Sequence, residues 1–300
     1  MQNITPGAIA ALGLELIPAV GFGFAAERVG QSVARWPAAV RVILPSLLVA
    51  PYLLVAISEH IFRWQWFALY ALLPVAIAWL SLHAAAADPE QRGNWRDAFV
   101  LLVLGLAVDL RWFDSAWPSA WRALNELFLV DAGLYGFLAI RQLRGTGFDF
   151  HLKWSDWKTG LRELALFSPI VIVLGLALGF IHPHPNFPAY GVAAVRWAGS
   201  VVLRWVLIFF FTAVPEELFF RAWVQNLLER RVSRRTALII ASVVFGLSHF
   251  NKRSAHFNWR YVILATIAGI FYGRAWRENR RVPASTITHT TVDWLWGLWF

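Results

Sequence analysis

Long apolar runs separated by short polar connections make up most of this 300-residue chain. A helix needs about 20 mostly apolar residues to cross hydrocarbon, and local thinning of the bilayer allows fewer. Three short runs, 98–110, 127–140 and 237–250, are half-spans or parts of longer helices. The pattern predicts an all-α, polytopic transmembrane helix bundle of about eight to ten helices. Its candidate spans are 7–26, 42–58, 64–83, 98–110, 127–140, 164–181, 197–220, 237–250, 260–276 and 284–300.

Composition favours the same class. Hydrophobic residues make up 58% of the chain and charged residues 15%, whereas soluble domains carry about a quarter charged residues. Many tryptophans stand at the ends of apolar runs, which is typical of the aromatic belts at membrane interfaces. We therefore expect the lipid bilayer to be a partner of this protein. These tryptophans are Trp36, Trp64, Trp66, Trp112, Trp117, Trp197, Trp259 and Trp276.

The net charge of +9 comes from basic residues clustered in the short loops. If the N-terminus lies outside and all ten runs span, 18 basic residues fall in odd-numbered loops and 7 in even-numbered ones. This asymmetry predicts cytoplasmic odd-numbered loops in a bacterial-type inner or plasma membrane. Anionic lipid accounts for the positive charge, so we expect no nucleic-acid partner.

The segment 141–163 divides the chain. It is polar and aromatic, with Trp154 and Trp157 among basic residues, which predicts an interfacial linker or amphipathic helix. Residues 1–140 then form N-terminal transmembrane helices of unknown role, and 164–300 form a second set. The N-terminus lacks the basic region of a secretory signal, so the first run is expected to be a retained span. Cysteine is absent, which excludes disulfides, thiolate nucleophiles and Cys-ligated metals.

Ionisable side chains interrupt three apolar runs near the C-terminus, and such residues within a span mark functional sites by default. In Glu216-Glu217-Leu-Phe-Phe-Arg221, Glu217 and Arg221 are four apart and can pair on one helix face. Glu216 is rotated by about 100° from Glu217. We therefore expect Glu216 to face a cavity, where a carboxylate can act as a general base.

Two histidines follow, in Phe245-Gly-Leu-Ser-His249 and His289-Thr-Thr-Val-Asp293. Glu216 precedes Arg230 by 14 residues and His249 follows Arg235 by 14, so both lie ~21 Å from the same membrane surface. Antiparallel helices would bring them to matching depth. His289 and Asp293 share a helix face, so Asp293 can set the imidazole tautomer.

These ordered motifs resemble those of the CAAX prenyl protease and bacteriocin-processing family (CPBP or ABI proteases), whose pattern is EExxxR, FxxxH and HxxxN or HxxxD. The resemblance covers roughly residues 197–300. It implies an intramembrane glutamic endopeptidase without a cofactor, acting on a prenylated, leader-type or other membrane-associated peptide or protein. Glu216 and His249 would activate water, and His289 with Asp293 would stabilise the oxyanion. The supporting residues would be Glu217, Arg221 and Phe245.

One position departs from the prenyl proteases, which carry Asn where this chain carries Asp293. An ionised Asp cannot donate a hydrogen bond to an oxyanion. Asp293 is therefore expected to orient His289, which leaves His289 as the donor. A protonated Asp293 could also donate.

Other interpretations of these motifs stay open. Glu216, Glu217, His249 and His289 are of the types that bind zinc, although the HExxH spacing of zincins is absent. The acids and Arg221 could form a structural ion-pair cluster, and the chain could be a catalytically inactive scaffold or immunity protein. A transporter is the alternative from another class, although Arg204, 12 residues before Glu216, could be a second counter-charge rather than a path residue. Its buried path would use Glu15, Asp109, Asp131, Arg204 and the Glu216–Glu217 pair.

Overall fold

The computed structural model describes residues 5–118, 121, 123–184, 192–252 and 256–300. Within these ranges the chain consists of helices and their connections, without strands. Five stretches are long and apolar enough to cross a membrane, and the prediction of an all-α polytopic membrane protein is confirmed. They are Pro6–Ala34, Ala38–Ser58, Trp64–Ala87, Trp154–Ala177 and Val195–Leu228.

The chain divides into two compact units. The N-terminal unit comprises Met1–Arg144 and Phe148–His151, and the C-terminal unit comprises Gly145–Gly147 and Leu152–Phe300. The helix α7 begins at Trp154, inside the segment 141–163 for which a linker or amphipathic helix was predicted.

The N-terminal unit is built around α1, which packs against α3, α6 and η4. The short elements α2, η1 and α3 follow one another without a break, and α6 continues directly into the π-helical stretch η4. The short predicted run 127–140 is therefore part of a longer helix. The elements are α1 (Pro6–Ala34), α2 (Ala38–Ile43), η1 (Leu44–Val49), α3 (Ala50–Ser58), α4 (Trp64–Ala87), α5 (Trp95–Asp109), η2 (Asp114–Ala116), α6 (Ala123–Leu134) and η4 (Tyr135–Ile140).

An ion pair closes the connection after α4 in this unit. Asp88 accepts hydrogen bonds from the backbone N–H groups of Arg92 (3.0 Å) and Gly93 (2.8 Å), and from Nη2 of Arg141 (2.6 Å). Burial disfavours the charge of Asp88, but these donors outweigh burial and lower the pKa of its carboxyl below the usual value. Asp88 therefore stabilises the fold in its ionised form.

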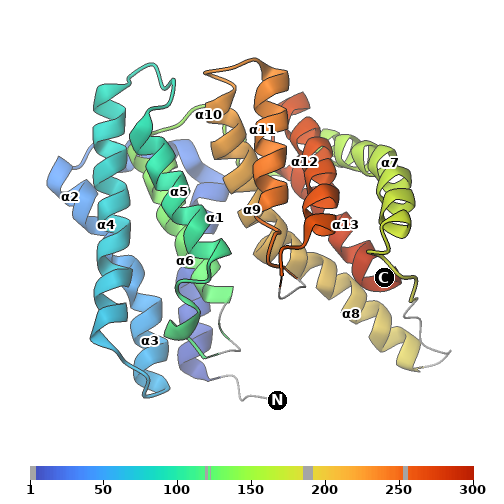
Figure 1. The fold of residues 1–300 in the computed structure, drawn as a ribbon. Helices are drawn as coiled ribbons and strands as arrows, with labels where there is room; N and C mark the ends of the chain where they lie inside the picture. Colours follow the sequence, from blue (N-terminus) through green and yellow to red (C-terminus); the bar gives the residue numbers. More distant parts are fainter. Residues whose placement is uncertain (1–4, 119–120, 122, 185–191, 253–255) are drawn as a thin grey trace. The chain divides into compact units, whose positions relative to one another are not determined.

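In its described residues, the C-terminal unit contains one long interrupted helix and the helices α7, α11, α12 and α13 (Figure 1). The elements from α8 to α10 follow one another directly, with π-helical stretches at η5 and η6. The elements are α7 (Trp154–Ala177), α8 (Val192–Ile208), η5 (Phe209–Ala213), α9 (Val214–Glu217), η6 (Leu218–Gln225), α10 (Asn226–Leu228), α11 (Arg234–Leu247), α12 (Trp259–Asn279) and α13 (Val282–Trp299).

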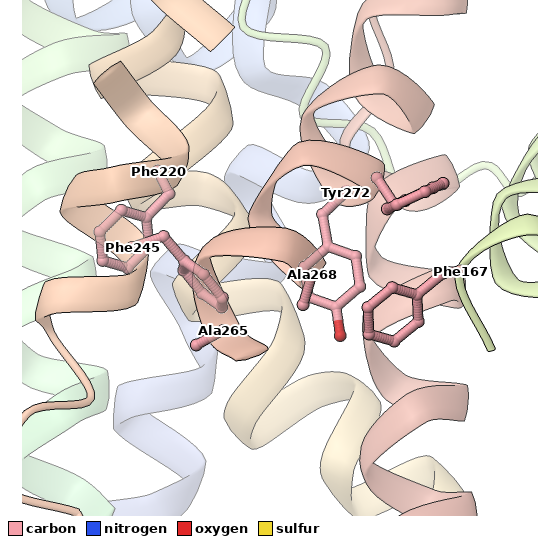
Figure 2. Close-up of a cluster of buried hydrophobic side chains, with 7 residues drawn as sticks. Phe167, Phe220, Phe245, Ala265, Ala268 and Tyr272 are labelled. Carbon is pink, nitrogen blue, oxygen red and sulfur yellow. The ribbon is translucent and has the colours of Figure 1, made fainter. Parts of the chain in front are cut away.

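An aromatic cluster forms the core of this unit (Figure 2). Its buried residues come from α7, η6, α11 and α12, so the core fixes the helices that carry the first two motifs. The helices α11 and α12 approach closely at Gly246, where a Cβ would lie 1.9 Å from Oγ1 of Thr266 and 2.6 Å from the carbonyl oxygen of Val262. The cluster comprises Phe167, Phe220, Phe245, Ala265, Ala268, Phe271 and Tyr272.

Candidate active site

The two adjacent acids lie where the long helix changes its hydrogen-bonding pattern. Glu216 and Glu217 end the four-residue α9, which separates the π-helical stretches η5 and η6. Pro215 near the start of α9 has no N–H to donate, which suits an interrupted backbone ladder. Isolated π-helical turns occur frequently at functional sites. The local backbone thus marks this position independently of the charges.

Glu217 is the centre of a dry ion-pair cluster. Its Oε2 accepts a hydrogen bond from Nε of Arg221 at 3.0 Å, and both side chains are fully buried. Its Oε1 lies 2.9 Å from Nδ1 of His289. The guanidinium of Arg221 also lies over the ring of Phe245, 5.1 Å from its centroid. The expected pairing of Glu217 with Arg221 is present, and Glu217 additionally joins the third motif to the first.

The tautomer of His249 follows from its backbone contact. Nδ1 lies 2.8 Å from the carbonyl oxygen of Phe245, one turn earlier on α11. A carbonyl only accepts, so Nδ1 carries the hydrogen, and Nε2 of the neutral ring is left as an acceptor. The rings of Phe245 and Tyr261 each lie 4.8 Å from the imidazole. His249 is thus a buried, oriented base.

Glu216 lies on the open side of the site, with its side chain 22% exposed. Nζ of Lys252 donates to its Oε1 at 3.3 Å. Its Oε2 is buried without a hydrogen-bond partner in the described part of the chain. Both His249 and His289 are electrostatic neighbours of this carboxylate. The structure therefore brings together the first acid and both motif histidines.

His289 lies between the dry cluster and the open side. Its Nε2 is 3.9 Å from Oε2 of Glu216 and 3.6 Å from Oδ2 of Asp293, distances that are too long for direct hydrogen bonds. The ring stacks on Tyr272 at 4.6 Å. With Glu217 accepting from Nδ1–H, Nε2 of a neutral ring would be an acceptor. An Nε2–H donor is present only in the imidazolium, which the neighbouring carboxylates of Glu216, Glu217 and Asp293 stabilise.

Asp293 lies beside His289, as their spacing predicts, but it is not the only acid at the imidazole. The carboxylate in hydrogen-bonding contact with the imidazole belongs to Glu217, 72 residues away in the chain, and Asp293 is 39% exposed near the opposite nitrogen. For Arg204, a possible second counter-charge, the structure shows a partner other than Glu216. Arg204 donates from Nη1 to the carbonyl oxygen of Gly297, near the end of α13.

Sequence reasoning did not identify Lys252, Tyr261 and Tyr272 as part of the site. Lys252 follows His249 by three residues, about one turn, and that spacing was the available signal. The two tyrosines lie on α12 among apolar residues and are indistinguishable from core positions. Among the described residues, no group of three His, Asp or Glu side chains is arranged to hold a metal ion.

Residues 197–295 match the family model described as type II CAAX prenyl endopeptidase Rce1-like. No curated protein and no solved structure matches the chain. The matched segment contains all three motifs, from Glu216 to Asp293, together with Lys252. Residues 197–295 are thus an Rce1-like domain of the CAAX protease family.

Proposed function

We propose that this protein is an intramembrane glutamic endopeptidase whose site lies in residues 197–295. One observation carries the proposal. His249 and His289, from two different helices, both lie near the partly exposed carboxylate of Glu216 on a third helix. The match to a family described as endopeptidases supports the same reaction class.

In the proposed reaction, a water molecule sits beside the unpartnered Oε2 of Glu216. Glu216 takes a proton from this water, with Nε2 of His249 accepting the second hydrogen bond. The water oxygen then forms a bond to the peptide carbonyl carbon, and the carbonyl π electrons move to oxygen. Nε2–H of His289 donates to that oxyanion. Collapse of the intermediate breaks the C–N bond, and the proton held by Glu216 passes to the leaving amine.

Glu217 and Arg221 act as positioning residues in this scheme. Glu217 accepts from Nδ1–H of His289 and stabilises the imidazolium, whose second hydrogen, on Nε2, is the donor in this scheme. Arg221 balances the buried charge of Glu217. Lys252 holds one oxygen of Glu216 and leaves the other for water.

The proposed substrate is a peptide bond of a membrane-associated protein, either a prenylated tail or a leader-type segment, reached from the bilayer. We place the protein in a bacterial-type inner or plasma membrane with its basic loops in the cytoplasm, on the charge asymmetry of the loops. No metal or other cofactor is part of the proposal.

The test is cleavage of a quenched peptide library by the purified full-length protein in detergent, with and without chelator. Glu216→Gln is compared with Glu278→Gln, which removes a half-exposed acid paired with Arg162 outside the site. We expect chelator-resistant cleavage that Glu216→Gln abolishes and Glu278→Gln retains. Cleavage by Glu216→Gln would refute the assignment of the base.

Two further outcomes would redirect the proposal. Cleavage that chelator abolishes would mean a zinc protease, built on the same acids and histidines. A folded protein that cleaves neither the library nor prenylated and leader-type peptides would favour an inactive scaffold, and a flux assay in vesicles would then test transport.

A further inference from the structure

The N-terminal unit holds two buried acids that the proposed protease reaction does not use. Glu15 lies midway along α1 and Asp131 lies on α6, and each residue is 1% exposed. The two helices pack against each other (Figure 1), and the two carboxyl groups lie within hydrogen-bonding reach of one another. Ala11, Phe22 and Phe128 are buried apolar residues of the same two helices.

Neither acid has a counter-charge or a donor in the described part of the chain. All four carboxyl oxygens are buried, and none accepts a hydrogen bond from a donor group in the described part of the chain. The titratable hydroxyls on the packed elements donate elsewhere: Tyr52 to the carbonyl oxygen of Arg63, Tyr70 to Asn125 and Tyr135 to the carbonyl oxygen of Arg41. If both carboxyl groups were ionised, no described residue would therefore balance their negative charge.

The helix α6 carries another buried polar group, the side-chain amide of Asn125. The Nδ2 group of Asn125, on α6, is buried and has no hydrogen-bond partner among the described residues. Its Oδ1 accepts from Tyr70, whose hydroxyl accepts in turn from Nε1 of Trp117. Tyr70 is an electrostatic neighbour of Glu15. A polar chain thus runs from α4 and α6 toward the acid pair.

Two ionised carboxylates in contact within hydrocarbon repel each other, and each loses its hydration. Two carboxylates are also both acceptors, so no hydrogen bond can form between them without a proton. A metal cation would separate the two groups by sitting between them, whereas a proton fits two carboxyls in direct contact. We propose that Glu15 and Asp131 form a proton-binding site in which one carboxyl donates to the other.

Infrared spectroscopy on the full-length protein at neutral pH tests this site, because a protonated carboxyl has a C=O band distinct from the carboxylate bands. The spectra of wild type, Glu15→Gln and the double variant Glu15→Gln/Asp131→Asn are compared in H2O and D2O. Glu27→Gln, an exposed acid on the same helix, is the matched control. We expect a deuterium-sensitive protonated-carboxyl band in wild type and Glu27→Gln that both other variants lack.

The neutral amides mimic a protonated carboxyl in shape and charge, so the double variant should fold. If it does not, the single variant Glu15→Gln decides, because its amide donates to the Asp131 carboxylate and no proton is needed. A wild-type spectrum that differs from the variants only in carboxylate bands would overturn the proposal. So would carboxylate bands that shift when sodium replaces choline, since a metal cation would then occupy the site.

Discussion

Replacing Arg221 with Met tests the buried ion pair at the base of the candidate site. Arg221 is fully buried and donates to Oε2 of Glu217, while Nδ1 of His289 contacts Oε1. In the variant, Glu217 loses Arg221 but keeps its contact with His289. We therefore expect Arg221→Met to fold with a reduced free energy of unfolding, in addition to losing activity.

The size of this loss follows from the contacts that disappear. A hydrogen bond to a charged group contributes about 1.5–3 kcal/mol, and the desolvated cation–π contact with Phe245 contributes about 2 kcal/mol. Breaking one side of a buried ion pair costs about 3–5 kcal/mol. Because His289 still contacts Glu217, we expect a loss near the lower end, about 3 kcal/mol.

Reversible unfolding in mixed micelles with increasing dodecyl sulfate measures this loss. The double variant Glu217→Gln/Arg221→Met is the decisive comparison, because it removes the stranded charge and should recover part of the stability. Arg221→Lys is the control that keeps the charge. A single variant within about 1 kcal/mol of wild type, or a double variant less stable than the single one, would refute this account of the pair.

Three other predictions concern the stability that single contacts contribute. Lys252→Met should lower the free energy of unfolding by less than about 1 kcal/mol, since that ion pair is 37% exposed on the lysine side; a larger loss in micelle unfolding would contradict this. Gly246→Ala should lower the free energy of unfolding by about 1–3 kcal/mol, because the added Cβ overpacks α11 against α12. The control Gly199→Ala should not destabilise, since no atom lies within 4 Å of its Cβ. Equal melting temperatures for the two variants would contradict the close approach of α11 and α12. The ionised carboxylate of Asp88 stabilises the fold at pH values above its unfolded pKa of about 3.9, and this stabilisation is lost as the pH falls through the lower folded pKa. Below about pH 4, the melting temperature of Asp88→Asn should therefore fall less with decreasing pH than that of wild type.

The contacts that the sequence predicts correctly are those within one helix. Glu217 and Arg221 are four residues apart, and helix geometry alone brings them together. The contact between Glu217 and His289 joins two helices, and the sequence does not contain the rotation of one helix against the other. The spacing of His289 and Asp293 predicts that they lie close together, but it does not predict that Glu217 contacts the other nitrogen, Nδ1.

Two other deviations have local causes. Arg204 and Glu216 are 12 residues apart, which at 3.6 residues per turn gives an offset of ~120°. The π-helical η5 lies between them and winds more slowly, so this offset does not hold. The helix α7 begins ten residues before the predicted span because its first turns bury charged residues in pairs. Asp156 meets Arg281 at 2.7 Å and Glu163 meets Arg274 at 3.0 Å, and a hydropathy pattern cannot recognise paired charges.

The site is divided into a dry half and an open half, and the proposed reaction needs both. Glu217 and Arg221 are fully buried and His289 nearly so, which keeps the imidazole in one orientation. Glu216 and Asp293 are 22% and 39% exposed, and the proposed reaction places the water and the peptide at these side chains. Substitutions in the dry half should therefore reduce stability and turnover together, whereas Glu216→Gln should reduce turnover alone, and a shared stability loss would show that the two halves are one structural cluster.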